Sequence, residues 1–237
     1  MVNSALPPLV ITSLGALLIF LQNDFSSAVI LVLVAAALFW AAEVPVRFFA
    51  ALGTILLPLT ALSVLTSDFR LRRIIGFLYP GYELPALGYQ VNGSLRAIRA
   101  GGFWGKGLGL GTLKLTSIPE VQSDFVFSAF AEEAGFLGVL AFLGLWGFFL
   151  WRGYRTAFRN EDRFRSYLAF GLSTSLGIQV LVNIAVAAGA LPATGIALPF
   201  YSAGGSSFLE AAAACGLLYN LSRGAPGTRA DTEVPHE

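Results

Sequence analysis

Histidine and cysteine are almost absent from this chain of 237 residues. The one histidine is His236, near the C-terminus, and the one cysteine is Cys215, within an apolar, alanine-rich run. An intrachain disulfide is therefore excluded, as are the Ser-His triad and most zinc sites. A nucleophilic thiol needs a basic neighbour to lower its pKa, and none adjoins Cys215 in the sequence. Acid–base chemistry must come from carboxylates, lysine or tyrosine.

Charged residues are also scarce. They make up 12% of the chain, whereas 56% is hydrophobic, and an average soluble protein is about 25% charged. This composition predicts an integral membrane protein without a separate soluble domain of ordinary size. The formal net charge of +1 argues against a nucleic-acid-binding protein, which would need a broad basic face. The N-terminus has no charged region and no cleavage site, so we interpret its apolar run as a membrane anchor rather than a signal peptide.

Six segments are long and apolar enough to cross about 30 Å of hydrocarbon. They are residues 7–22, 26–42, 45–66, 124–151, 166–190 and 204–222. We therefore expect an all-α, polytopic membrane bundle with about six transmembrane helices. Its expected parts are three transmembrane helices in 1–66, an extracytoplasmic loop in 67–123, three transmembrane helices in 124–223, and a cytoplasmic tail in 224–237.

The arginines predict the orientation of the bundle. Residues 152–165 hold five arginines in a short connection, which the positive-inside rule places in the cytoplasm. By alternation, both termini are cytoplasmic. The loop 67–123 and the stretch 191–203 then lie on the outer face.

The loop 67–123 carries seven basic residues and three acidic ones. Residues 69–79 mix arginine with apolar residues and predict a helix lying in the membrane interface. Residues 89–100 predict a second short helix, and the six glycines of 101–111 indicate a close backbone approach to a ligand or a helix. Two roles remain open for the basic residues: attraction to lipid headgroups, or a cationic site for an anionic ligand.

Polar residues also occur within the predicted C-terminal helices. Gln179 and Asn183 lie four residues apart on one helix face, where hydrogen bonding between helices is the common role. The stretch 191–207 contains two prolines and three glycines, and irregular backbone at membrane depth must be buried in protein or line a wet cavity. Glu210 follows, either as a functional carboxylate or paired with a basic residue.

Two carboxylates, Glu120 and Asp124, stand just before the apolar run that continues to Trp151. Asp124 at the start of a helix can cap free backbone N–H groups. Ser123 could cap instead and leave Asp124 free for acid–base chemistry. The residues alone leave both roles open.

Several separated motifs occur in a recognisable order. Residues 22–28 (QNDFSSA) resemble QPDFGTA, residues 89–111 resemble YQ…S…AI…GG..GKGLG, Lys114 with 118–127 resembles K…LPE..TDFIF, residues 132–135 fit EE.G, and residues 183–207 resemble N…P.TG..LP..S.GGSS. The chain thus resembles the SEDS family of FtsW, RodA and SpoVE proteins, which build the bacterial cell wall. The resemblance spans nearly the whole chain but only the C-terminal portion of a typical ten-helix member.

This resemblance implies a peptidoglycan glycosyltransferase at the outer face of the bacterial inner membrane. Such enzymes polymerise lipid II, an undecaprenyl-diphosphate-linked disaccharide pentapeptide, by an inverting displacement, and their usual partner is a class B penicillin-binding protein. The family's essential aspartate falls on Asp124, which we expect to act as the base. Phe25 and Lys114 favour the FtsW-like division branch.

The remaining expected site residues form a substrate-binding set: Lys114, Lys106, Glu120, Gln90, Ser94, Arg96, Arg99, Asn183, Ser202, Ser206 and Ser207. Its basic members would stabilise the leaving diphosphate. A divalent cation, Mg or Mn, could share that task, with Asp24 and Glu120 as ligands. No other cofactor is implied.

Some residues depart from the family pattern, namely Leu113, Gln122, Ala197 and Ala203. Four N-terminal helices of the family also have no counterpart here, which puts independent catalysis in question. Two alternatives therefore stay open. One is a non-catalytic scaffold for the class B penicillin-binding protein. The other is a lipid II flippase or transporter, which would need charges along a path through the bilayer, whereas here they gather on one face.

Overall fold

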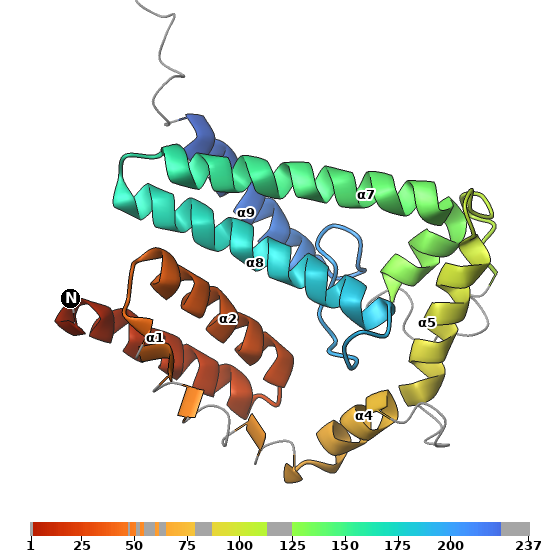
Figure 1. Ribbon diagram of the computed structural model, residues 1–237, viewed down its shortest axis with the longest axis horizontal. Helices are drawn as coiled ribbons and strands as arrows, with labels where there is room; N and C mark the ends of the chain where they lie inside the picture. The colour runs from red at the N-terminus through yellow and green to blue at the C-terminus, as the bar shows by residue number, and fades with distance from the viewer. Residues whose placement is uncertain are drawn as a thin grey trace, which may run out of the picture.

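The computed structural model describes residues 2–46, 48–50, 53–54, 60–61, 65–78, 87–112 and 125–223. All regular structure within these residues is helical (Figure 1), which confirms the predicted all-α class. The helices with assigned bounds are α1 (Val2–Leu21), α2 (Phe25–Ala41), α4 (Asp68–Leu78), α5 (Leu87–Gly101), α7 (Val126–Arg159), α8 (Arg163–Ala187) and α9 (Gly205–Arg223).

Five of the six predicted spans coincide with α1, α2, α7, α8 and α9. Among the described helices, α7 and α8 are long and apolar enough to cross a membrane, and residues 7–21 and 25–41 form shorter apolar helices. The sixth predicted span, 45–66, lies mostly outside the described residues. The division into four parts remains a prediction.

The connection between α7 and α8 is shorter than the predicted loop 152–165. Helix α7 continues to Arg159 and α8 begins at Arg163, so most of that segment is helical. Arginine is a good helix former, which lets α7 continue past the end of its apolar run. Asp162 then caps α8, because its carboxylate accepts a hydrogen bond from the backbone N–H of Phe164 at 3.2 Å.

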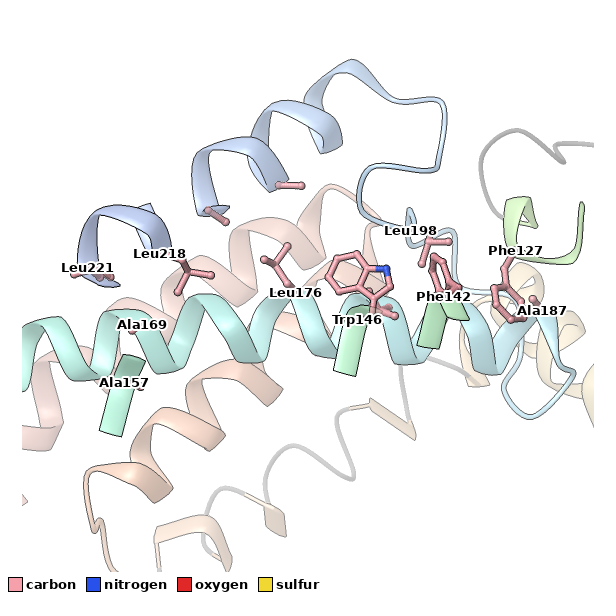
Figure 2. Packing of buried hydrophobic residues seen from close by; sticks show 13 residues of the cluster. Phe127, Phe142, Trp146, Ala157, Ala169, Leu176, Ala187, Leu198, Leu218 and Leu221 are labelled. Carbon is pink, nitrogen blue, oxygen red and sulfur yellow. The ribbon is translucent and has the colours of Figure 1, made fainter. Parts of the chain in front are cut away.

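Helix α8 is the centre of the bundle and packs against α2, α7 and α9. Figure 2 shows Phe142 and Trp146 from α7, Leu176 from α8 and Leu218 from α9 gathered in one apolar cluster. Such aromatic and aliphatic side chains interlock closely, and each buried one contributes about 1.5–3 kcal/mol when it leaves water. In a bilayer the gain comes from packing instead, because lipid tails are equally apolar.

The predicted interfacial helix 69–79 corresponds to α4, which lies beside α5 (Figure 1). Two of its arginines contact protein. The Arg70 guanidinium lies 5.2 Å from the ring centre of Phe20 and 5.5 Å from that of Phe25. Arg73 Nη1 donates a hydrogen bond to the Ala193 carbonyl at 3.0 Å. These contacts tie α4 to the tip of the α1–α2 hairpin and to the loop between α8 and α9.

Helix α7 was predicted to be continuous over 124–151, but it is interrupted at Gly135. This glycine has φ 65° and ψ −168°, a conformation outside the helical region. The two parts of α7 meet at an angle there, beside the end of α5 (Figure 1).

The interruption is needed because the glycine-rich loop that follows α5, residues 102–112, packs directly against α7 at Gly135. A Cβ on Gly101 would lie 2.1 Å from the Ala131 carbonyl oxygen. The predicted close approach of these glycines is therefore confirmed, and it is an approach to a helix.

Two glycines of this loop offer a matched test of that packing. Gly105 (φ 80°) and Gly109 (φ 81°) share the same left-handed backbone, which costs a residue with a side chain about 1–2 kcal/mol. A Cβ on Gly105 would lie 2.1 Å from the Glu133 carbonyl oxygen, whereas one on Gly109 meets nothing within 4 Å. We expect Gly105→Ala to lower the thermal unfolding temperature in detergent clearly more than Gly109→Ala, by a further overpacking cost of about 1–3 kcal/mol. Equal losses in the two variants would contradict the packing of the loop against α7.

Candidate functional site

The glycine-rich loop replaces two hydrogen bonds that α7 would otherwise make internally. In an uninterrupted helix, the N–H groups of Phe136 and Leu137 would bond the carbonyls of Glu132 and Glu133. Here Phe136 N donates to Gly102 O at 2.9 Å, and Leu137 N donates to Phe103 O at 3.3 Å.

The two carbonyls released from the helix are taken up by the same loop. Lys106 N donates to Glu132 O at 3.1 Å, and Gly107 N donates to Glu133 O at 3.0 Å. These four backbone groups at the break all find loop partners, which avoids the cost of several kcal/mol that an unpaired buried polar group carries. The loop and the interrupted helix therefore form a single structural unit.

An ion pair between a fully buried carboxylate and a partly exposed lysine lies at the same place. The Glu132 side chain is fully buried, and its Oε1 lies 2.6 Å from Lys106 Nζ. The same oxygen accepts a hydrogen bond from the backbone N–H of Thr112 at 3.1 Å. Breaking a buried pair by removing one partner is strongly destabilising, so this pair holds both the middle and the end of the loop on α7.

The segment 113–124 connects this loop to the start of α7. It contains Lys114, Glu120 and Asp124, so these three predicted site residues lie outside the described residues. The described residues on either side of it are firmly held. Thr112 bonds Glu132, and Phe125 is 1% exposed among Ala97 of α5 and Val186 of α8.

The first turn of α7 also bears on the role of Asp124. The helix begins at Val126 with Phe125 in the N-cap position, and the Phe125 side chain makes no capping hydrogen bond. Ser123 and Asp124 lie outside the described residues, so their predicted capping role stays a prediction. Asp124 as the base stays a prediction.

Helix α5 carries four of the predicted substrate-binding residues. Ser94 is fully buried, and its hydroxyl donates to the Ala187 carbonyl of α8 at 2.6 Å. Gln90 is half-buried. Arg96 and Arg99 are exposed, and Arg96 Nε donates to the Asn92 carbonyl of the same helix at 3.3 Å. Ser94 thus has a packing role, whereas the guanidinium groups of the two arginines face the surroundings.

The other predicted polar residues hold the loop between α8 and α9. Asn183 is buried and its Nδ2 donates to the Ile196 carbonyl at 2.8 Å. Ser202 Oγ accepts from the Leu198 N–H at 2.8 Å. Ser207 donates to the Gly204 carbonyl at 3.0 Å, whereas Ser206 is exposed.

The predicted hydrogen bonding between membrane helices is confirmed at Gln179. Its Nε2 lies 3.2 Å from Glu210 Oε1, which links α8 to α9. Glu210 therefore contacts an amide, not the basic partner that one of the two interpretations required. A substrate-binding role for these polar residues remains a prediction.

Asp24 was a predicted metal ligand, but both of its carboxylate oxygens cap α2. Oδ1 accepts from the Ser27 N–H at 3.0 Å, and Oδ2 accepts from the Ser27 hydroxyl at 2.6 Å. The described residues contain no group of three or more His, Cys, Asp or Glu side chains that could hold a metal ion. Glu120, the other predicted ligand, lies outside the described residues, so the divalent cation stays a prediction and no step is assigned to it.

Glu132 is the residue that sequence reasoning left out of the site. A carboxylate within an apolar helical run is costly unless it is paired, and Lys106 is the one ionisable residue in 101–112. Those two observations together were the available signal for the pair. What they lacked was the break at Gly135, which brings the loop against the helix.

A double-mutant cycle tests the ion pair. Lys106→Met keeps much of the side-chain volume but removes the cation beside a buried carboxylate. We expect a loss of stability smaller than the about 3–5 kcal/mol of a fully buried pair, because the Lys106 side chain is 33% exposed. Adding Glu132→Gln should recover a large part of that loss, because the buried charge is removed as well. Thermal unfolding of the two single variants and the double variant measures the coupling, and strictly additive effects would contradict it.

Comparisons with known proteins agree with this geometry. The family model FtsW/RodA/SpoVE, described as cell cycle protein, matches residues 1–226. The probable peptidoglycan glycosyltransferase FtsW of Borreliella burgdorferi is 38% identical over 216 residues, which are 91% of this chain and 59% of that protein. The protein of the same description from Geobacter sulfurreducens is 39% identical over 224 residues, which are 93% of this chain and 60% of that protein. The chain thus spans about three-fifths of the length of these relatives.

Solved structures show the same fold. A chain from a peptidoglycan synthase complex that coordinates polymerization and crosslinking is 30% identical with a TM-score of 0.72, covering 93% of this chain and 62% of that one. The rod shape determining protein RodA of Thermus thermophilus is 28% identical with a TM-score of 0.60, covering 91% of this chain and 55% of that one. The chain belongs to the FtsW/RodA/SpoVE family of cell cycle proteins, which are multi-pass proteins of the inner membrane.

Proposed function

We propose that this chain carries the catalytic site of a peptidoglycan glycosyltransferase that polymerises lipid II into glycan strands. The observation that carries the proposal is the attachment of segment 113–124 at both ends, through Thr112 to Glu132 and through Phe125 to α5 and α8. The expected base, Asp124, directly precedes Phe125 in the chain. The relatives described as probable peptidoglycan glycosyltransferases support the same reaction.

The reaction requires an acceptor sugar hydroxyl to attack an anomeric carbon that bears a diphosphate. In the proposed mechanism, the Asp124 carboxylate takes the hydroxyl proton as the new glycosidic bond forms. The bond from the anomeric carbon to the diphosphate oxygen breaks in the same step, with inversion. Undecaprenyl diphosphate leaves with the bonding electron pair, and no covalent enzyme intermediate is needed.

Positive charge must stabilise the departing diphosphate. Arg96 and Arg99 are exposed on α5, the helix that leads into the glycine-rich loop. Together with Lys114, they are the groups we assign to this task. The Lys106 ammonium is already held by Glu132 at 2.6 Å, so its proposed role is to position the loop and not to bind the diphosphate.

The proposed site lies on the outer face of the inner membrane, as the arginine distribution predicts. A class B penicillin-binding protein is the proposed partner, and the similarity to a chain of a peptidoglycan synthase complex supports this choice. One rival is a scaffold that recruits the transpeptidase without catalysis. The same partner serves both proposals, so an activity assay must separate them.

Replacement of the base is the direct test. We expect Asp124→Asn to abolish polymerisation of labelled lipid II by the purified protein with its transpeptidase partner, while membrane insertion is unchanged. Asp162→Asn makes the same chemical change at the α7–α8 turn, where asparagine still caps α8, and should retain activity. Full activity of Asp124→Asn would overturn the assignment. An inactive parent chain that still binds the transpeptidase would favour the scaffold.

The two α5 arginines provide a second test. We expect Arg96→Gln and Arg99→Gln each to lower kcat/KM for lipid II by roughly tenfold or more, equivalent to about 1.4 kcal/mol of transition-state stabilisation. Arg152→Gln is the matched control, because Arg152 is exposed near the other end of α7. Steady-state kinetics at fixed ionic strength would measure the effect. Equal losses in all three variants would indicate a general charge effect and contradict a site on α5.

A further inference from the structure

The glycine-rich loop presents large apolar side chains to its surroundings. Phe103 is 54% exposed, Trp104 76%, Leu108 81% and Leu110 67%. Four such side chains within eight residues would be unfavourable in water, since each has much apolar area to bury. Exposed apolar patches of this kind mark contacts with a membrane or another protein.

The single ionisable residue of the loop is one-third exposed, and its charge is paired with protein. Lys106 lies between Trp104 and Leu108 in the chain, but its ammonium is turned toward the buried carboxylate of Glu132 at 2.6 Å. The ion pair therefore partly neutralises the one charge of the loop, at a side chain that is 33% exposed. The more exposed large side chains of residues 103–110 are apolar.

The backbone of the loop also meets part of the requirement that lipid imposes, which is internal satisfaction of N–H groups. Six of these donors have protein partners within 3.3 Å, in residues Gly102, Gly105, Lys106, Gly107, Leu110 and Thr112. Three of them bond carbonyl or carboxylate oxygens of Glu132 and Glu133 on α7. An irregular segment with about half of its donors paired in this way can lie in the membrane interface, where water reaches the others.

The apolar surface of the loop continues directly onto the membrane-facing surface of α7. Phe103 stacks on Phe136 with ring centres 5.8 Å apart and an angle of 24° between the rings, and Trp104 contacts Phe103 edge-on at 5.2 Å. Phe136 is itself exposed, as are Leu140 and Leu143 farther along α7. Only 17% of the apolar stretch of α7 is buried within the protein, so most of its surface is available to lipid.

We propose that residues 103–110 insert into the membrane, with Trp104, Leu108 and Leu110 among the acyl chains of the leaflet at the N-terminal end of α7. Tryptophan is favoured at this depth because its ring is apolar while its N–H can reach the polar boundary. The Lys106–Glu132 pair then lies at the surface of the bilayer. This inference concerns the phospholipid membrane and does not depend on the reaction proposed above.

Site-directed spin labelling tests the insertion. A nitroxide would be placed on Leu108→Cys in a Cys215→Ala background, with the whole chain reconstituted in phosphatidylethanolamine and phosphatidylglycerol vesicles. Leu140→Cys on α7 serves as the lipid-facing reference, and Glu161→Cys at the exposed α7–α8 turn serves as the aqueous one. We expect the ratio of oxygen to nickel-chelate accessibility at position 108 to match that at 140 and to exceed that at 161 at least threefold.

A ratio at position 108 equal to that at 161 would overturn the proposal and leave a protein partner as the occupant of the loop surface. An unlabelled measurement provides independent evidence. The tryptophan emission removed by Trp104→Phe should be quenched by lipids brominated on their acyl chains and protected from aqueous iodide. The reverse pattern would also overturn the proposal.

Discussion

The site depends on one exchange of hydrogen bonds. Helix α7 gives up two internal hydrogen bonds and forms hydrogen bonds to the loop after α5 instead. Without it, the carbonyls of Glu132 and Glu133 and the N–H groups of Phe136 and Leu137 would close an ordinary helix. With it, the chain bends at Gly135 and the loop becomes part of the helix. The backbone groups at the break keep hydrogen-bond partners in this exchange, so the bend has a small net cost in folding free energy.

This arrangement explains why a fully buried carboxylate is tolerated in a membrane helix. Glu132 would be costly alone in an apolar setting. The bend brings Lys106 and the Thr112 N–H to its oxygen, and these contacts offset part of the cost of removing the carboxylate from water. The same contacts define where the segment carrying Asp124 begins. The contacts that stabilise the buried carboxylate therefore also hold one end of the segment that contains the proposed base.

The polar side chains of the bundle fall into two groups: some are hydrogen-bonded to backbone groups, and others are exposed. Ser94, Asn183 and Ser202 are engaged in hydrogen bonds to the backbone and thereby hold α5, α8 and the loop before α9 together. Arg96 and Arg99 remain exposed on α5, near the apolar loop surface. Guanidinium groups beside a lipid-facing loop are suited to an anionic group carried at the end of a lipid chain.

Several features follow from the sequence alone. Scarce charge and long apolar runs determine an all-helical membrane protein, because only helices satisfy their backbone groups internally in lipid with segments of this length. The helices at 26–42 and 204–222 are predicted to within a residue or two of α2 and α9. The motifs also identify the family, and they predict Asp124 as the base. The interruption at Gly135, the pairing of Lys106 with Glu132 and the packing role of Ser94 were decided only by the tertiary structure. Each joins residues that are distant in the chain, and helical periodicity describes only neighbours within a few turns.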